Sequence, residues 1–211
     1  MADTVHVYLF DGYADWEPAF AMAGIQNPQY QRQPGRWQVR TVGDGSRRAV
    51  RSMGGVTAVP DLALHELEPQ ASAMLVLPGG ERWDEPEAHR AAVDKARDFL
   101  AHGVTVAAIC GATAGLARAG LLDDRAHTSN AASYLKGTGY AGAERYVDAP
   151  AVRADRLITA GGMAPIEFAR EIFAALALYD DDALEAWFQL YKTGKSAFFA
   201  RMERAADSAQ A

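Results

Sequence analysis

The chain has 211 residues, of which 49% are apolar and 23% are charged, and this ordinary globular composition excludes a largely disordered chain. Its 21 Lys and Arg residues against 27 Asp and Glu residues give a net charge of −6, and because the basic residues are scattered we expect no nucleic-acid partner. The sequence has no apolar run near the roughly 20 residues needed to span a bilayer, no secretory signal and a single cysteine, so we expect a cytoplasmic protein with no membrane partner and no internal disulfide.

The first 80 residues alternate between strand-like runs and turns. Four strands are predicted, at residues 4–10, 37–42, 56–59 and 73–77. The first strand is followed by a turn and then by Asp15, which is placed to cap a helix entered through Trp16 and Glu17. The fourth is a continuous apolar run that stops at Pro78-Gly79-Gly80, a pattern typical of a strand buried on both faces.

The rest of the chain alternates between helices and strands. Helices are predicted at residues 87–102 and 111–120, and strands at 104–109 and 157–160. Two further helices are predicted from apolar faces, one formed by Ile166, Ala169, Phe173 and Leu176 and the other by Leu184, Trp187, Phe188 and Tyr191. This order requires right-handed crossovers, and therefore a mostly parallel sheet with helices on both faces. We predict one α/β domain over residues 1–211, with a C-terminal helical extension at about 182–203.

Cys110 is the main chemical signal because it lies where the apolar strand 104–109 meets a helix that begins with small residues. In a parallel sheet such a turn points its side chain into the crevice at the carboxyl ends of the strands, where ligands bind. The helix N-terminus favours a thiolate, so we expect the pKa of Cys110 to be lowered from its usual value of about 8.5. The alternative is a buried structural cysteine, since free cysteine often packs as a small apolar residue.

The segment 107–117, with 119–122 after it, resembles the nucleophile segment of the ThiJ/PfpI family. Three more segments resemble that family in the same order, namely Phe10-Asp11-Gly12 with Glu17, Leu77-Pro78-Gly79-Gly80, and Leu157-Ile158-Thr159-Ala160 with Glu167-Phe168-Ala169. The family shares the flavodoxin-like fold of the class I glutamine amidotransferases and includes the parkinsonism-associated deglycase. The resemblance implies a flavodoxin-like three-layer sandwich, a nucleophile elbow at Cys110 and a homodimer.

The resemblance also implies roles for individual residues. Cys110 takes the place of the reactive cysteine, and Glu17 takes the place of the acid that hydrogen-bonds to it, which requires Glu17 to be protonated because two touching anions oppose each other. Without the resemblance, Glu17 is a solvent-facing acid in a first helical turn. The backbone N–H groups of Gly80 and Gly111 are candidates for an oxyanion hole, although Gly80 with its neighbour Gly79 is equally suited to a simple turn.

The sequence departs from the family at the histidine that some members carry. Gly111 follows the cysteine directly, and Asn130 stands at the other histidine position, where it can position a substrate or water but cannot act as a base. His127, three residues earlier, is the candidate that reaches the site from the same loop. Asp15 and Trp16 are candidates for the pocket mouth, with a helix N-cap and a packed aromatic as the alternative roles.

These residues predict an enzyme that acts on a small molecule, without a metal or other cofactor. A Cys110 thiolate assisted by Glu17 would attack a reactive carbonyl or a related electrophile, as in a glyoxalase, a deglycase or an isocyanide hydratase. The alternative is a protein of the oxidative or carbonyl stress response, in which Cys110 is oxidised to a sulfinate. A third function, as an amidotransferase or peptidase, normally requires a histidine base that the sequence does not place clearly.

Overall fold

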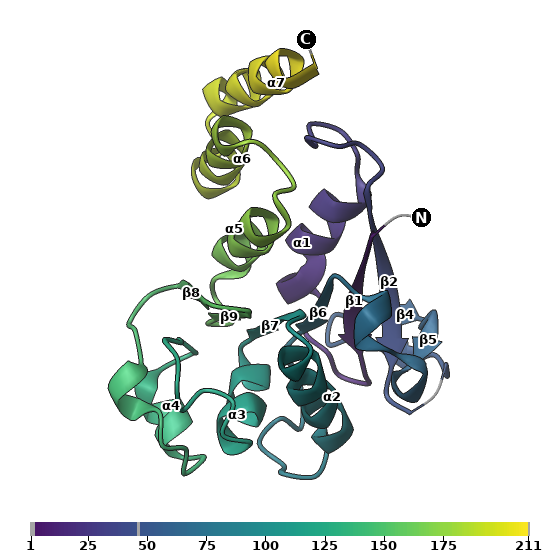
Figure 1. The fold of residues 1–211 in the computed structure, drawn as a ribbon, viewed down its shortest axis with the longest axis vertical. Coiled ribbons are helices and arrows are strands. Elements are labelled where there is room, and N and C mark those ends of the chain that lie inside the picture. The colour runs from purple at the N-terminus through teal and green to yellow at the C-terminus, as the bar shows by residue number, and fades with distance from the viewer. Residues whose placement is uncertain (1–2, 46, 211) are drawn as a thin grey trace.

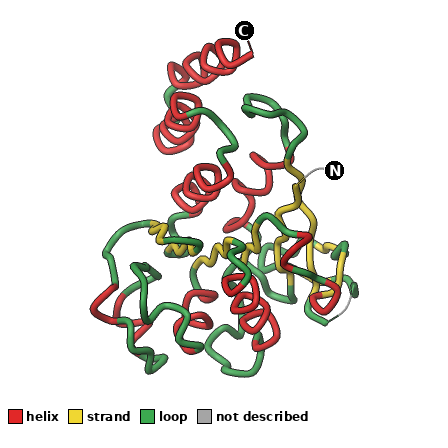
Figure 2. Tube along the Cα trace, viewed as in Figure 1, coloured by secondary structure: helices red, strands yellow, loops and turns green. Residues whose placement is uncertain are grey.

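A twisted sheet crosses the middle of the molecule between two layers of helices (Figures 1 and 2). The computed structural model describes residues 3–45 and 47–210. In the described part of the chain the sheet has seven strands in the order β5-β2-β1-β6-β7-β9-β8. Their bounds are β1 Asp3–Leu9, β2 Trp37–Gly43, β5 Leu62–Ala63, β6 Met74–Leu77, β7 Thr105–Ile109, β8 Ala151–Ala154 and β9 Leu157–Ala160. All neighbouring strands are parallel except β8 and β9, so the predicted mostly parallel, flavodoxin-like sheet is confirmed.

Helices cover both faces of this sheet. Figure 1 shows α1 (Trp16–Gln26) and α5 (Pro165–Leu176) on one side, and α2 (Arg90–Ala101) and α3 (Gly111–Arg118) on the other. The short α4 (Ala132–Lys136) packs against α3, and α6 (Asp181–Thr193) and α7 (Ser196–Gln210) pack on each other beyond α5. None of the helices in the described ranges combines the length and the apolar character that a membrane span needs.

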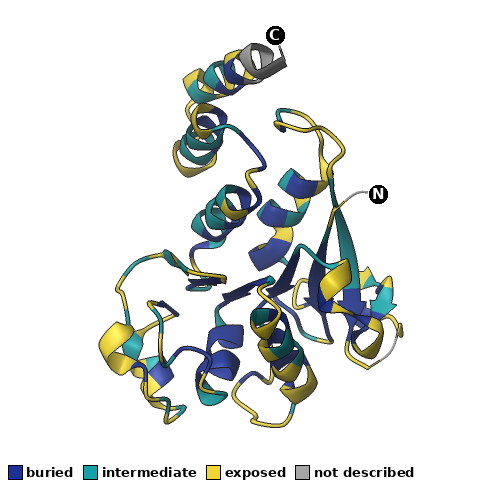
Figure 3. Ribbon diagram, viewed as in Figure 1, coloured by how far each residue is buried: buried dark blue, intermediate teal, exposed yellow. Residues whose placement is uncertain are grey.

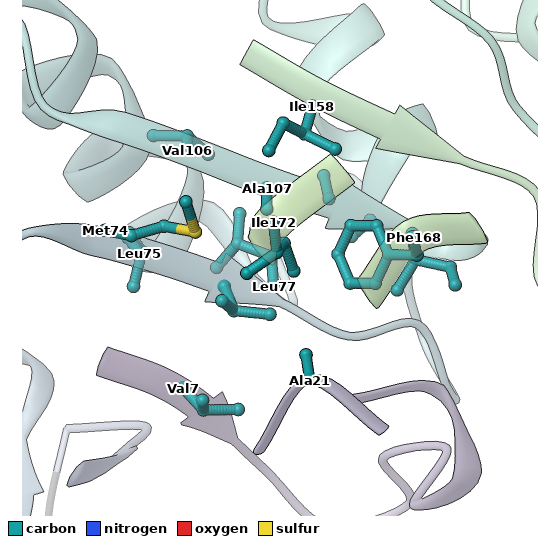
Figure 4. Packing of buried hydrophobic residues seen from close by; sticks show 14 of the residues in the cluster. Val7, Ala21, Met74, Leu75, Leu77, Val106, Ala107, Ile158, Phe168 and Ile172 are labelled. Carbon is teal, nitrogen blue, oxygen red and sulfur yellow. The ribbon is translucent and has the colours of Figure 1, made fainter. Parts of the chain in front are cut away.

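The core explains why the central strands read as continuous apolar runs. Every residue of β6, β7 and β9 is buried, as Figure 3 shows for the middle of the sheet. Figure 4 shows side chains of β6 and β7, such as Leu77 and Ala107, packed with Ile172 and Phe168 of α5. A strand that is covered on both faces has no polar side to alternate with, so it is apolar throughout.

The structure differs from the predicted elements at the edges of the sheet. The strand predicted at residues 56–59 is β4 (Thr57–Ala58), which pairs antiparallel with β3 (Val50–Arg51) in a separate two-stranded sheet. The strands β5 and β8 and the helix α4 were not predicted, and neither were the three short 3₁₀ helices at Leu64–Glu66, Pro69–Ala71 and Ala143–Arg145. The C-terminal helices extend to Gln210, beyond the predicted end near residue 203.

Candidate active site

Cys110 lies between β7 and α3 in a backbone conformation that is costly for a residue with a side chain. Its φ of 58° and ψ of −125° fall in a region that residues other than glycine rarely adopt. The turn is held from both sides, because Cys110 N–H donates to Ala160 O at 2.9 Å and the Thr113 hydroxyl donates to Cys110 O at 2.6 Å. This is the strand–nucleophile–helix elbow that the sequence predicted, and it fixes the direction of the sulfur.

Two glycines leave room for the sulfur. A side-chain carbon on Gly79, after β6, would lie 3.0 Å from Cys110 Sγ, and one on Gly162, after β9, would lie 2.8 Å from it. Both glycines follow strands of the same parallel sheet, whose carboxyl ends meet at one edge. Gly162 is a site residue that the sequence analysis missed, although its place after a buried strand matches that of Gly79.

Glu17 approaches the sulfur from the first turn of α1. It is 0% exposed, so the alternative of a solvent-facing acid is wrong. Its Oε2 accepts a hydrogen bond from Gly79 N–H at 2.6 Å, whereas its buried Oε1 has no regular hydrogen-bond partner among the described residues. The carboxyl group lies within hydrogen-bonding reach of the Cys110 thiol. Burial raises the pKa of Glu17, and the contacts with Cys110 and Gly79 oppose this rise.

The pKa of Cys110 differs from the expectation drawn from the helix N-terminus. Beside an ionised Glu17, burial and then the negative charge of that carboxylate raise it to about 11, against the opposing hydrogen bonds from Asn130 and from the backbone N–H of Gly111. The expectation that the start of α3 by itself lowers this pKa is therefore wrong as long as Glu17 carries its charge. The effect of a helix N-terminus is worth about 1 kcal/mol or less, too little to outweigh burial next to a carboxylate.

Asn130 contacts the sulfur directly. Its Nδ2 donates to Cys110 Sγ at 3.4 Å, while its Oδ1 accepts from Gly162 N–H at 2.8 Å. Because the second bond occupies the oxygen, the amide can present only its N–H₂ group to the sulfur. Asn130 thus stands at the sulfur, with its amide held in one orientation.

His127 does not join this group. It is fully buried, with Nδ1 2.9 Å from Arg125 O and Nε2 3.1 Å from the Tyr140 hydroxyl. Both ring nitrogens have partners other than Cys110, so the structure does not bring His127 together with the sulfur.

The other predicted site residues have separate roles. Gly80 has a φ of 140°, and a side-chain carbon there would lie 2.4 Å from Gly12 O, so this glycine is required by the turn itself. Gly111 N–H points at Cys110 and supplies one of its donors. Asp15 is the N-cap residue of α1, as predicted, but its side chain makes no cap bond and instead accepts from the Ser52 hydroxyl at 2.5 Å. Trp16 is 47% exposed beside Glu17, not packed in the core.

A pocket of about 670 Å³ adjoins the site and is lined in part by Asn130. Its lining includes Ser129, Asn130, Gly161, Met163, Glu167 and Lys192. The pocket shares Asn130 with the cysteine site, so a small molecule bound there would lie beside the donor that faces the sulfur. Within residues 3–45 and 47–210, no group of three or more His, Cys, Asp or Glu side chains is arranged to hold a metal ion.

The chain is similar in sequence to proteins of one family over most of its length. The sequence profile of the DJ-1/PfpI family matches residues 3–175. The uncharacterized protease YoaZ of Bacillus subtilis is 37% identical over 198 residues, which is 92% of this chain and 93% of that protein.

Two solved structures are similar to this chain throughout. A thiJ/pfpI family protein from Bacillus anthracis has a TM-score of 0.90 and 36% identity, with 97% of each chain covered. The DJ-1 superfamily protein Atu0886 from Agrobacterium tumefaciens has a TM-score of 0.80 and 32% identity, covering 91% of this chain and 98% of that one.

Proposed function

Because the chain belongs to the DJ-1/PfpI family, we propose that it is a cysteine-dependent hydrolase, hydratase or lyase that acts on a small reactive carbonyl or a related electrophile. The observation that carries the proposal is the set of groups around Cys110 Sγ, which consists of the Asn130 amide, the Gly111 N–H and the buried carboxyl group of Glu17. An arrangement of donors around one sulfur suits a thiolate nucleophile.

In the reactive state we place the shared proton on Glu17 rather than on the thiol. A buried carboxylate requires donors at both oxygens, but Glu17 has a regular donor only at Oε2. The sulfur, in contrast, has two N–H donors, which a neutral thiol does not need. With a proton on Oε1, Glu17 donates to the thiolate and becomes its third donor. The same proton removes the charge that, after burial, raises the pKa of Cys110.

The chemical step follows from this proton position. The thiolate forms a C–S bond with the carbonyl carbon, and the electron pair of the C=O π bond moves to the oxygen. The Asn130 and Gly111 donors, released as the sulfur loses its charge, stabilise that oxyanion. Glu17 then transfers its proton to the oxygen, which leaves a neutral adduct and a carboxylate that can accept a proton in the next step.

Turnover assays test the proposal. The protein would be incubated with an α-oxoaldehyde, with a glycated amine and with an isocyanide, and substrate and product would be followed by NMR. We expect turnover of at least one class by the wild type and none by Cys110→Ser, which differs by one atom. Equal rates for the two proteins with all three classes would reject the proposed function.

A second candidate function rests on the exposure of the sulfur. Cys110 is partly exposed next to a buried acid, and because it is the only cysteine no second thiol can resolve a sulfenate within the chain. Oxidation would therefore proceed to a sulfinate, which a protonated Glu17 would stabilise. A stable gain of two oxygen atoms on Cys110 at low peroxide, without turnover, would favour this sensor function over the enzyme.

A peptidase or amidotransferase is the weakest of the three candidates. The relative from Bacillus subtilis is named an uncharacterized protease. In the described part of this chain, however, the partners of the sulfur are a carboxyl, an amide and a backbone N–H, and the nearby His127 is bound elsewhere. Both mechanisms normally use an imidazole base.

A further inference from the structure

A single hydrogen bond joins two segments that flank the cysteine. The Tyr134 hydroxyl donates to Asp84 Oδ1 at 2.9 Å, and we name this pair the clasp. Asp84 belongs to the loop after the Pro78-Gly79-Gly80 turn, and Tyr134 lies in α4, four residues after Asn130. The clasp therefore connects the loop that follows β6 to the segment that carries the donor of the sulfur.

The Asp84 side of the clasp is firmly attached to the nucleophile helix. The preceding residue, Trp83, is 2% exposed and donates from Nε1 to Pro78 O at 3.1 Å. Its side chain lies so close to α3 that an added carbon on Gly111 or Gly115 would be 2.8 or 2.6 Å from it. Trp83, the neighbour of Asp84 in the chain, is therefore packed tightly against the helix that follows Cys110.

The Tyr134 side carries Asn130, whose side-chain oxygen is also held by Gly162 N–H at 2.8 Å. Asn130 is exposed, and α4, which begins two residues later, has only five residues, too few to be stable as a helix by itself. Leu135 anchors α4 in the core, and the clasp anchors its first turn. Burial, and then the hydrogen bond to Asp84, raise the pKa of Tyr134 above its usual value.

We propose that the clasp is a positioning contact that keeps the Asn130 amide within hydrogen-bonding reach of Cys110 Sγ. Tyr134 and Asp84 act through Asn130 and do not touch the reacting atoms. The inference rests on the proposed function only in that Cys110 is the nucleophile. Its test measures the ionisation of the single cysteine and needs no substrate, so it can fail or succeed independently of the turnover assays.

The experiment measures the rate of alkylation by iodoacetamide against pH, with the product followed by intact mass. Tyr134→Phe and Asp84→Ala break the clasp. Each is expected to weaken the hydrogen bond from Asn130 to the thiolate and so to raise the apparent pKa of Cys110 by about one unit, the effect of losing one hydrogen bond to a charged group. Asp84→Asn keeps an acceptor for the tyrosine and is expected to match the wild type. Tyr140→Phe is the control, because it removes a tyrosine hydrogen bond, to His127, from the same part of the chain.

A double substitution shows whether the clasp acts through Asn130. Asn130→Ala should raise the apparent pKa of the thiol, and adding Tyr134→Phe to it should raise the pKa no further. An unchanged pKa in Tyr134→Phe, or an equal rise in the presence and absence of Asn130, would overturn the proposal. Circular dichroism of each variant checks the fold, and if Asp84→Ala does not fold, the near-isosteric Tyr134→Phe decides the question by itself.

Discussion

Replacing Glu17 by Gln distinguishes the two positions of the proton that Glu17 and Cys110 share. Gln has nearly the same shape, and its amide oxygen can accept the hydrogen bond from Gly79 N–H in place of Oε2. Its N–H₂ group then occupies the position of Oε1 and donates to the sulfur. The substitution thus keeps both contacts and removes only the ability to carry a charge.

The size of the effect depends on where the proton is. If Glu17 is protonated beside a thiolate, the amide N–H of the glutamine replaces the carboxyl O–H as donor to the sulfur. The amide is the weaker donor, so the thiolate loses about 1 kcal/mol of stabilisation and the pKa of Cys110 rises by about one unit or less. If Glu17 is ionised beside a neutral thiol, the substitution removes a charge within hydrogen-bonding reach of the sulfur. A unit charge at about 4 Å is worth about 4 kcal/mol at an effective dielectric constant near 20. The pKa of Cys110 would then fall by about three units from its value near 11.

The assay compares the pH dependence of iodoacetamide alkylation in the wild type and in Glu17→Gln. Cys110 is the only cysteine, so the labelled mass reports this thiol alone. We expect the two midpoints to lie within about one unit, with that of the variant higher. A midpoint in Glu17→Gln about three units below that of the wild type would refute the protonated Glu17.

Three further predictions concern the neighbours of the site and the stability of the fold. Gly162→Ala should abolish the alkylation of Cys110, measured by intact mass, because the new carbon would lie 2.8 Å from its sulfur. In the control Gly137→Ala, where the nearest neighbour of the new carbon is a backbone oxygen 3.4 Å away, Cys110 should be alkylated at the wild-type rate. Asp180→Ala removes the cap of α6, where Oδ1 accepts from a backbone N–H at 2.8 Å, and should cost about 1 kcal/mol and about 2–4 °C in Tm, measured by calorimetry. The pKa of Glu17 is raised above 4.5, so its contribution to the free energy of unfolding is complete below that pH and is lost as the pH rises through the native pKa. Urea unfolding should therefore show that the free energy of unfolding of Glu17→Gln increases relative to that of the wild type from pH about 4 to 8.

The central strands were predictable from the sequence and the edge strands were not. β6, β7 and β9 are buried throughout and therefore read as apolar runs that end at turns. β5 has only two residues, and β8 is half-buried and pairs antiparallel with β9 across a short turn, so neither carries a strong pattern. α4 has five residues, fewer than the periodic pattern of a helix requires.

The candidate site was predictable in its residues more than in its geometry. Cys110 follows from the local strand–helix pattern and Glu17 from the resemblance to the ThiJ/PfpI family. The bond between Asn130 and Gly162, in contrast, joins two loops whose approach depends on the whole fold. The failed expectation for the cysteine pKa has the same origin. The helix N-terminus is a local feature that the sequence displays, whereas burial and the carboxylate of a distant residue are set by tertiary packing.

The central claim is that Cys110 is a thiolate nucleophile stabilised by donors that include a protonated Glu17. The most direct measurement is the ultraviolet absorbance of the thiolate as a function of pH, with Cys110→Ser as the blank. We expect ionisation with a midpoint below the usual value of about 8.5, since donors that bind a charged form favour it. A single ionisation near pH 11, with no thiolate at neutral pH, would show that the proton stays on the sulfur and would contradict the proposed chemistry.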